Sequence, residues 1–206
     1  SKLGTEKSGG TKIFCVSGHV QQPGTFEVPL GTPFKDLLAL AGGMREGRTC
    51  KAVIPGGSSM KIIPGDVMLS LNMDYESIAA QGSALGSGGV IVMDDTTCMV
   101  QALASVLHFY EHESCGQCTP CREGTPWVSK IVKNILRGQG RLDDVARLVS
   151  IARGIEGHTI CAFGEAVAWP VLSFMDHFSD EFEYVIRHGR SQVTGEPLTR
   201  FGLTAA

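Results

Sequence analysis

The pattern of hydrophobic and polar positions changes character once along the chain, near residue 94. Before that point, short apolar runs alternate with turn residues, and we interpret these runs as β-strands: 12–17, 26–28, 52–54, 60–63, 67–69 and 90–93. After that point, apolar residues recur at the three- and four-residue spacing of amphipathic helices. The pattern therefore predicts an α+β protein in which strands and helices are segregated.

The strands of the first region surround one predicted helix. A turn at residues 22–24 joins the first two strands into a hairpin. A helix follows, with Thr32 as its cap and Pro33 as its first residue, and it ends at Gly42 and Gly43. Two hairpin strands, one helix and then further strands predict a small ubiquitin-like β-grasp domain, a mixed sheet with a helix across one face.

The second region predicts four helices joined by short loops, which is typical of a four-helix bundle. Their expected starts are a cap at Thr96 or Thr97, the Thr125-Pro126 pair, a cap at Asp143 or Asp144, and Pro170. We therefore divide the chain into a flexible N-terminal segment (1–10), a β-grasp domain (11–93), a helical bundle (94–190) and a flexible tail (191–206).

Composition excludes several classes of protein. The 206 residues are 43% hydrophobic and 19% charged, as in ordinary soluble proteins. A net charge of −3 without a basic run argues against a nucleic-acid partner. No apolar run is long enough for direct membrane insertion. The polar N-terminus lacks a signal peptide and a starting Met, so we expect a portion of a longer gene product.

Three of the seven cysteines lie within seven residues, in the stretch ESCGQCTPCRE between the first two predicted bundle helices. Cys115, Cys118 and Cys121 are separated by two residues each, which lets successive thiolates turn toward one centre. Such a triplet can hold three corners of a cubane iron–sulfur cluster, which needs a fourth thiolate. Cys161 is the candidate, because it lies between the third and fourth helices, and alternate loops of an up-down bundle lie at the same end.

Two other chemistries remain open for these thiols. A zinc ion held by four thiolates is the main alternative, although zinc sites usually take two separated pairs of cysteines. A thioredoxin-like redox pair fits less well, because its cysteines follow a strand, whereas these follow a helix. The remaining cysteines show no pattern: we expect Cys15 and Cys98 as buried small hydrophobes and Cys50 in a loop.

Polar neighbours of the triplet allow both functional and ordinary interpretations. Arg122 could stabilise a reduced, anionic cluster, or it could pair with Glu113 or Glu123 on the surface. His112 and His158 flank the cysteine loops, but with four cysteines available we expect both outside the ligand set. We find no Ser/His/Asp set, no pair of acids and no phosphate loop, so we assign no catalytic residue.

Two motifs resemble a known family. The stretches HESCGQCTPCREGT and GHTICAFGEAVAWP are similar to the C-terminal half of the NADH-binding flavoprotein subunit of respiratory complex I, NADH:quinone oxidoreductase. The earlier stretches VSGHVQQPGTFEVPLGTPFKDLLALAGGM and GSALGSGGVIVMDD resemble that subunit's soluble-ligand-binding β-grasp segment and its link to the bundle. Related subunits of NAD-linked hydrogenase and formate dehydrogenase share this architecture.

The resemblance implies a role in electron transfer. The four cysteines would ligate one 4Fe–4S cluster that relays single electrons from flavin. FMN and NADH would bind only to the family's N-terminal domain, which is absent from these 206 residues, so we expect no hydride-transfer site. Expected partners are that flavin- and NADH-binding domain, a thioredoxin-like 2Fe–2S subunit and other peripheral-arm subunits. The expected location is the cytoplasmic face of the bacterial inner membrane, or the mitochondrial matrix side.

Overall fold

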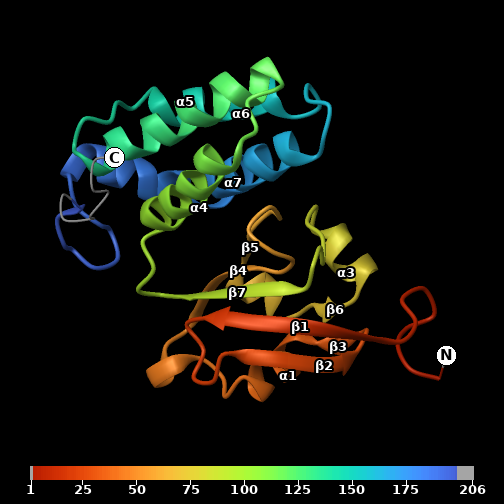
Figure 1. The fold of residues 1–206 in the computed structure, drawn as a ribbon. Helices are drawn as coiled ribbons and strands as arrows, with labels where there is room; N and C mark the ends of the chain where they lie inside the picture. The colour runs from red at the N-terminus through yellow and green to blue at the C-terminus, as the bar shows by residue number, and fades with distance from the viewer. Residues whose placement is uncertain (1, 199–206) are drawn as a thin grey trace. The chain divides into compact units, whose positions relative to one another are not determined.

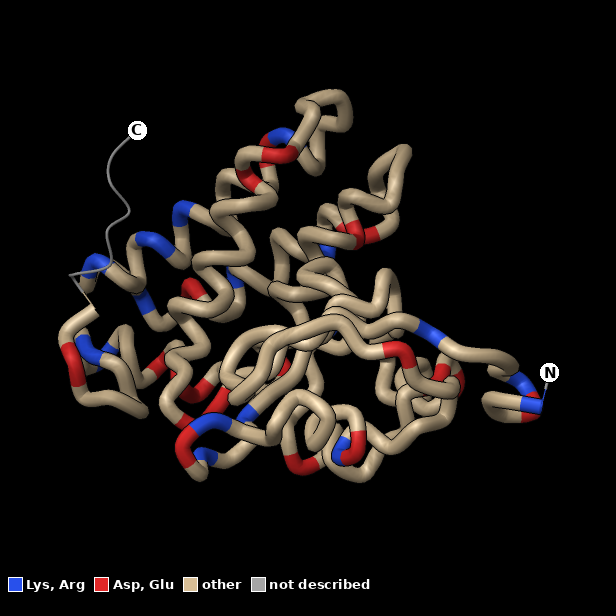
Figure 2. The backbone as a smooth tube through the Cα atoms, turned by 60° about the horizontal axis from the view of Figure 1, so that its bottom comes forward, with Lys and Arg blue, Asp and Glu red and all other residues tan. Residues whose placement is uncertain are grey.

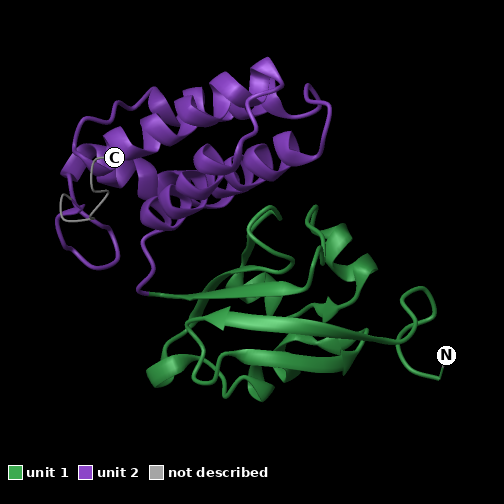
Figure 3. Ribbon diagram, in the orientation of Figure 1, with its two compact units in different colours: residues 1–95 green, residues 96–206 purple. Residues whose placement is uncertain are grey.

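The structure, a computed structural model, describes residues 2–198. The chain divides into two compact units, Ser1–Asp95 and Thr96–Ala206, which Figure 3 colours green and purple. Among the described residues, all the long strands belong to the first unit and all the long helices to the second. This segregation agrees with the predicted α+β class. Residues 199–206, predicted as part of a flexible tail, lie outside the described residues.

The first unit is built on a five-stranded mixed sheet (Figure 1). Its spatial order is β2-β1-β7-β4-β5, with β1 at Thr11–Gly18, β2 at Gly24–Pro29, β4 at Cys50–Ile54, β5 at Ile63–Pro64 and β7 at Gly89–Asp94. Strands β1 and β7 are parallel, whereas the other neighbours are antiparallel. The connections contain β3 (Thr32–Pro33), α1 (Phe34–Leu40), a 3-10 turn (Arg45–Gly47), α2 (Gly65–Met68), β6 (Asn72–Met73) and α3 (Tyr75–Ala80).

Alternation along β1 separates the core face of the sheet from its outer face. Phe14 and Val16 are buried, and they share one hydrophobic core with Phe34 and Leu37 of α1. Burial of each such side chain contributes roughly 1.5–3 kcal/mol. Cys15 lies between the two buried residues and is exposed. The prediction that Cys15 is buried is therefore wrong, because the two-residue period of a strand turns it away from the core.

Several short elements of this unit differ from the prediction. Residues 67–69, predicted as a strand, lie in and just after the single-turn helix α2. Only Ile63 of the predicted strand 60–63 belongs to β5. Helix α1 begins at Phe34 with Pro33 as its N-cap, while Thr32 pairs with β6. Three or four apolar residues do not distinguish a strand from one helical turn, which explains these differences.

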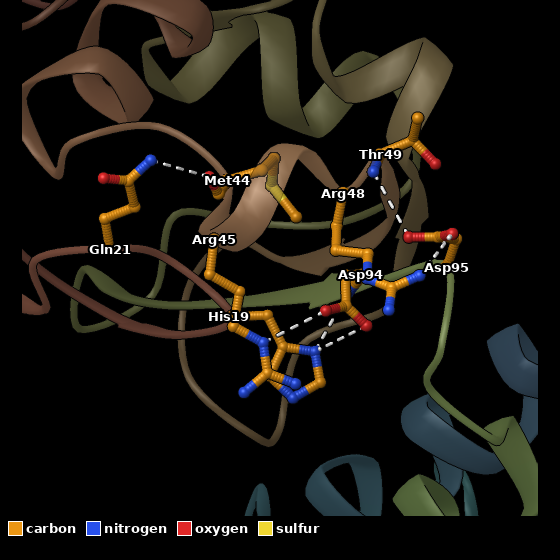
Figure 4. Close-up of polar contacts among 8 residues, drawn as sticks. All are labelled: His19, Gln21, Met44, Arg45, Arg48, Thr49, Asp94 and Asp95. Carbon is orange, nitrogen blue, oxygen red and sulfur yellow. Dashed lines mark hydrogen bonds and ion pairs between the residues drawn. The ribbon is translucent and has the colours of Figure 1, made fainter.

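Asp94 ends β7 within a polar cluster (Figure 4). Its fully buried carboxylate lies 2.9 Å from His19 Nδ1 and 3.2 Å from Arg45 Nε. Asp94 thus belongs to the sheet and not to the start of the first bundle helix, because β7 continues through it and its charge is paired inside the first unit. The sequence pattern pointed to no partner for His19. The pairing of β1 with β7 brings it to a residue 75 positions away.

The described part of the second unit consists of four helices. They are α4 (Met99–Glu113), α5 (Thr119–Leu136), α6 (Asp144–Ile155) and α7 (Phe163–His188), and α7 packs against each of the other three. Each helix buries one apolar face, which in α4 includes Val100, Leu103 and Leu107. The amphipathic pattern of the sequence therefore places these helices correctly. The predicted cap of α6 at Asp143 is confirmed, whereas the first residues of the other three helices differ from the prediction.

Helices α4 and α7 show why the predicted helix starts were inexact. Cys98, which is 4% exposed as predicted, is the N-cap of α4 in place of a threonine. The Glu181 carboxylate of α7 accepts from the Met99 amide at 3.3 Å, so a distant side chain supplies the acceptor that a local cap would provide. Helix α7 begins at Phe163, and Pro170 lies inside it rather than at its start. The preference of proline for the first turn of a helix therefore gave the wrong start for α7.

A half-buried ion pair links α4 and α5. The Glu111 carboxylate accepts from Lys133 Nζ at 2.6 Å and from Ser129 Oγ at 2.7 Å. Burial by itself raises the pKa of Glu111, but these hydrogen bonds and the positive charges of Lys133 and His108 outweigh burial and lower the pKa below its ordinary value of 4.5. The ionised carboxylate therefore helps to hold the two helices together.

The described parts of both predicted flexible ends make specific contacts. The Ser8 hydroxyl donates to Glu76 Oε2 at 2.7 Å, and the Leu30 amide donates to the Gly10 carbonyl at 3.0 Å. Near the other end, Leu198 is 3% exposed. Basic and acidic residues are interspersed along both units (Figure 2). Among the described residues, we find no helix with the length and apolarity needed to cross a membrane.

Candidate metal centre

The loop between α4 and α5 carries three of the four predicted ligands. Cys115 lies in the loop, Cys118 is the N-cap of α5, and Cys121 lies in the first turn of that helix. Exposure falls along the series, because Cys115 is exposed, Cys118 is half-buried and Cys121 is 7% exposed. The predicted start of α5 at residues 125–126 is wrong, because Pro120 already occupies the first turn, where a proline costs no helical hydrogen bond.

Gly116 and Arg122 fix the shape of this loop. Gly116 has a φ of +77°, a left-handed conformation that favours glycine. The Arg122 guanidinium donates to the Gly116 carbonyl at 3.0 Å, and its Nε lies 3.0 Å from Glu123 Oε1. Arg122 therefore pairs with Glu123, as one interpretation predicted, and its guanidinium also contacts the cysteine loop.

Cys161 comes from the loop between α6 and α7, which is held by three local features. Glu165 Oε1 accepts from the Gly157 amide at 2.9 Å, and the Thr159 hydroxyl donates to the Cys161 carbonyl at 2.8 Å. Gly164 lets the loop approach α7, because a Cβ at this position would lie 2.3 Å from Thr159 Oγ1. A larger residue there would displace the segment that carries Cys161.

The two cysteine loops meet at one end of the helical unit (Figure 1). The Ile160 amide donates to Cys118 Sγ at 3.4 Å. The ring of Tyr110 in α4 packs edge-to-face on Phe163 at the start of α7, with centroids 5.5 Å apart. All four predicted cysteines, together with Phe163, line one cavity of about 190 Å³. Residues far apart in sequence are thus brought to a common space.

The donor set fits a polynuclear cluster. Cysteine thiolates are the usual ligands of iron–sulfur clusters. A four-thiolate zinc site would instead require every sulfur to lie about 2.3 Å from one ion. Here four thiols from two loops surround one cavity, and four cysteine thiolates are the ligand set that a 4Fe–4S cluster takes.

The other candidate residues do not line the cavity. His112 is 82% exposed and lies 3.6 Å from Glu113, and His158 Nδ1 lies 2.7 Å from the Glu156 carbonyl oxygen. Cys50 begins β4 rather than lying in a loop, and burial raises the pKa of its thiol to about 11. Because this thiol stays protonated at neutral pH, it is poorly suited to metal binding or nucleophilic chemistry.

Two protein families match separate parts of the chain. Residues 101–185 match the family described as the NADH-ubiquinone oxidoreductase-F iron-sulfur binding region. Residues 13–63 match the SLBB domain family. The first match contains all four cysteines of the cavity and lies within the helical unit. The matches indicate an iron–sulfur binding region in the helical unit and an SLBB domain in the first unit.

Individual relatives agree with these matches. The chain is 45% identical over 185 residues to the F subunit of NADH-quinone oxidoreductase of Rickettsia bellii, and 45% identical over 188 residues to that of Rickettsia typhi. These alignments cover 89% and 90% of this chain but 44% of each relative, so the chain spans less than half the length of the curated relatives it matches. Residues 101–185 of the helical unit are therefore similar to the iron–sulfur binding region of these F subunits, and this similarity supports a 4Fe–4S cluster as the cofactor.

Solved structures show the same fold. The crystal structure of an NAD+-reducing NiFe hydrogenase in its H2-reduced state contains a chain that is 32% identical to this one, with a TM-score of 0.80. The match covers 90% of this chain and 31% of the hydrogenase chain. The air-oxidised state of a hydrogenase of this kind gives the same TM-score and identity. The two compact units of this chain therefore recur together within larger NAD-linked redox proteins.

Proposed function

We propose that this chain is the electron-relay portion of an NADH:quinone oxidoreductase flavoprotein subunit. Its 4Fe–4S cluster would be held by Cys115, Cys118, Cys121 and Cys161 and, when bound, would supply one-electron transfer. One observation carries the proposal: four thiols from two loops line a single cavity of about 190 Å³. Relatives named as F subunits of NADH-quinone oxidoreductase, at 45% identity, support the particular reaction.

The residues around the cavity have separable roles in this proposal. Cys121 is buried and anchors the site to α5, whereas the exposed Cys115 and Cys161 close it from the solvent side. Phe163 contributes an apolar wall, which limits the access of water to the site. Arg122 holds a positive charge beside the first loop and so favours the more negative, reduced state.

The finer architecture belongs to the same proposal. We assign the sheet of the first unit to a β-grasp domain and the helices α4 to α7 of the second unit to a four-helix bundle. The parallel pairing of the first and last long strands, β1 and β7, supports the β-grasp topology, and the helix α1 follows the first hairpin as that topology requires. The packing of α7 on three other helices supports the bundle.

The partners we propose rest on the resemblance to these F subunits, of which the chain spans 44%. The first partner is the flavin- and NADH-binding domain of the same subunit. A thioredoxin-like 2Fe–2S subunit and other peripheral-arm subunits receive the electrons. The assembly lies peripherally on the cytoplasmic face of the bacterial inner membrane, or on the mitochondrial matrix side.

A second candidate function is the equivalent portion of an NAD-linked hydrogenase. The TM-score of 0.80 with NAD+-reducing hydrogenase chains favours it, although the identity of 32% is lower than that with the quinone-reducing relatives. Subunits that co-purify with the chain from its native source discriminate the two. A quinone-reducing complex supports the first function, and a nickel-containing subunit supports the second.

Metal analysis of the anaerobically purified chain tests the proposed site. We expect about four irons and four sulfides per chain, a brown colour, and an electron paramagnetic resonance (EPR) signal after reduction with dithionite. Cys161→Ser should lose the cluster or degrade it, because one iron then lacks its thiolate. Cys15→Ser, at an exposed cysteine of the other unit, is the matched control and should keep full iron content. A colourless protein that binds zinc, or a Cys161→Ser variant with unchanged iron and sulfide, would contradict the assignment.

A further inference from the structure

Cys121 differs from the other three cysteines in the groups that face its sulfur. Ser114 Oγ lies 3.3 Å from Cys121 Sγ, and Thr125 Oγ1 lies 3.7 Å from it. Ser114 is the residue that follows α4, whereas Thr125 lies one turn beyond Cys121 in α5. Two hydroxyl groups from different helical segments therefore approach the most buried of the four sulfurs.

The direction of these hydrogen bonds follows from the chemistry of a metal ligand. A cysteine that binds iron is a thiolate and carries no proton, so both hydroxyls must donate to its sulfur. The oxygen of Ser114 accepts from the Gly116 amide at 3.4 Å, which leaves its own proton free for Cys121. Thr125 is 0% exposed, so water does not compete for its hydroxyl.

A helical threonine commonly returns its hydroxyl to a carbonyl of the preceding turn. The hydroxyl of Thr125 instead contacts the side chain of the residue four positions earlier, which is Cys121. The Ile160 amide donates to Cys118 Sγ in the same way. Hydrogen-bond donors therefore reach both of the less exposed sulfurs of the cavity, those of Cys118 and Cys121. Hydrogen bonds to ligand sulfurs stabilise the added negative charge of a reduced cluster.

We propose that the hydroxyl groups of Ser114 and Thr125 set the reduction potential of the centre by donating hydrogen bonds to Cys121 Sγ. The inference rests on the proposed function, because it requires Cys121 to be a thiolate ligand. The step concerned is the uptake of one electron, supplied in the test by dithionite through redox mediators. Neither hydroxyl loses its proton, so Ser114 and Thr125 are positioning residues that act through the ligand sulfur.

An EPR-monitored redox titration of the cluster-loaded chain tests the proposal. Thr125→Val keeps the shape of the side chain but removes the donor, and Ser114→Ala removes the second donor. Each variant should have a more negative midpoint reduction potential. The equilibrium constant for reduction should fall by up to about tenfold, which corresponds to about 59 mV for one electron. Thr125→Ser retains a hydroxyl and should stay near the unmodified chain.

Ser129→Ala is the matched control, because Ser129 lies one turn further along α5, is 1% exposed, and bonds Glu111 rather than a sulfur. If the midpoint potentials of Ser114→Ala and Thr125→Val equal the midpoint potential of Ser129→Ala, the inference is overturned and the proposed function stays intact. An unmodified chain that binds no cluster would overturn both. If Thr125→Val fails to fold, the more accessible Ser114→Ala decides the question alone, with a negative shift in support and an unchanged midpoint against.

Discussion

Gly164→Ala should damage the metal centre without touching a cysteine. A Cβ at this position would lie 2.3 Å from Thr159 Oγ1 and 2.8 Å from Thr159 Cγ2, so loop and helix must separate by about 1 Å to reach normal contact. Overpacking of this kind costs about 1–3 kcal/mol, and loss of the bond from Thr159 to the Cys161 carbonyl adds about 1 kcal/mol. The gain in helix propensity from alanine offsets up to about 1 kcal/mol. We therefore expect a net loss of about 2 kcal/mol.

Thermal unfolding and iron analysis measure this effect. For a unit of roughly this size, a loss of about 2 kcal/mol corresponds to a fall in Tm of about 8–16 °C. Iron content should also fall, because the displaced loop carries Cys161. Gly154→Ala is the control, since a Cβ at this exposed position of α6 meets no atom within 4 Å and should stabilise the protein by about 0.5–1 kcal/mol.

A second substitution isolates the steric cause. Thr159→Ala removes the two closest atoms that the new Cβ would meet, so it should restore part of the Tm in the Gly164→Ala background. Thr159→Ala by itself should lower Tm slightly, because it removes only the bond to the Cys161 carbonyl. Equal Tm and iron content for Gly164→Ala and Gly154→Ala would refute the argument that close approach of the loop to α7 positions Cys161.

Three further predictions concern charged and thiol groups away from the cavity. Asp94→Asn should destabilise the first unit by about 2–3 kcal/mol in chemical unfolding, because it weakens a fully buried ion-paired cluster, whereas Asp95→Asn at a half-exposed position should cost less than about 1 kcal/mol. Because the folded pKa of Glu111 lies below 4.5, its contribution to stability is present above that pH and is lost as the pH falls through the folded value. Glu111→Gln should therefore lower Tm by the equivalent of about 1 kcal/mol at pH 7 and by less at pH 3. An equal effect at both pH values would contradict this prediction. Iodoacetamide at pH 8 should modify the exposed Cys15 much faster than Cys50, because burial raises the pKa of the Cys50 thiol to about 11 and keeps it protonated. Equal rates of modification in peptide mapping would count against the burial of Cys50.

The order of elements was predictable wherever one face of a segment is buried. Phe14 and Val16 belong to a short apolar run that predicts β1, and the apolar stripe of α4 recurs at helical spacing. Element boundaries were less predictable, because several residues can serve as a start. Pro120 and residues 125–126 both carry a signal for the first turn of α5, and only packing selects the earlier one. Asp74, which caps α3 through the Ser77 amide, was a local signal that could have revealed that helix.

The partner of His19 could not be predicted, since it depends on the parallel pairing of two strands far apart in sequence. The same limit applies to Ser114, whose approach to Cys121 depends on the path of the loop between α4 and α5. Thr125 differs, because it lies four residues after Cys121 in the same helix, and that spacing is visible in the sequence.

The sequence by itself determined which residues could bind a metal, because thiol chemistry and two-residue spacing are local properties of the chain. It also determined the switch from strands to helices, because each element buries one face at its own period. Only the tertiary structure decided that Cys161 shares a cavity with the triplet, that Gly164 must lack a side chain, and that the Asp94 charge is paired within the sheet unit. These contacts join segments that are separated along the chain, and long-range packing, rather than local preference, sets their distances.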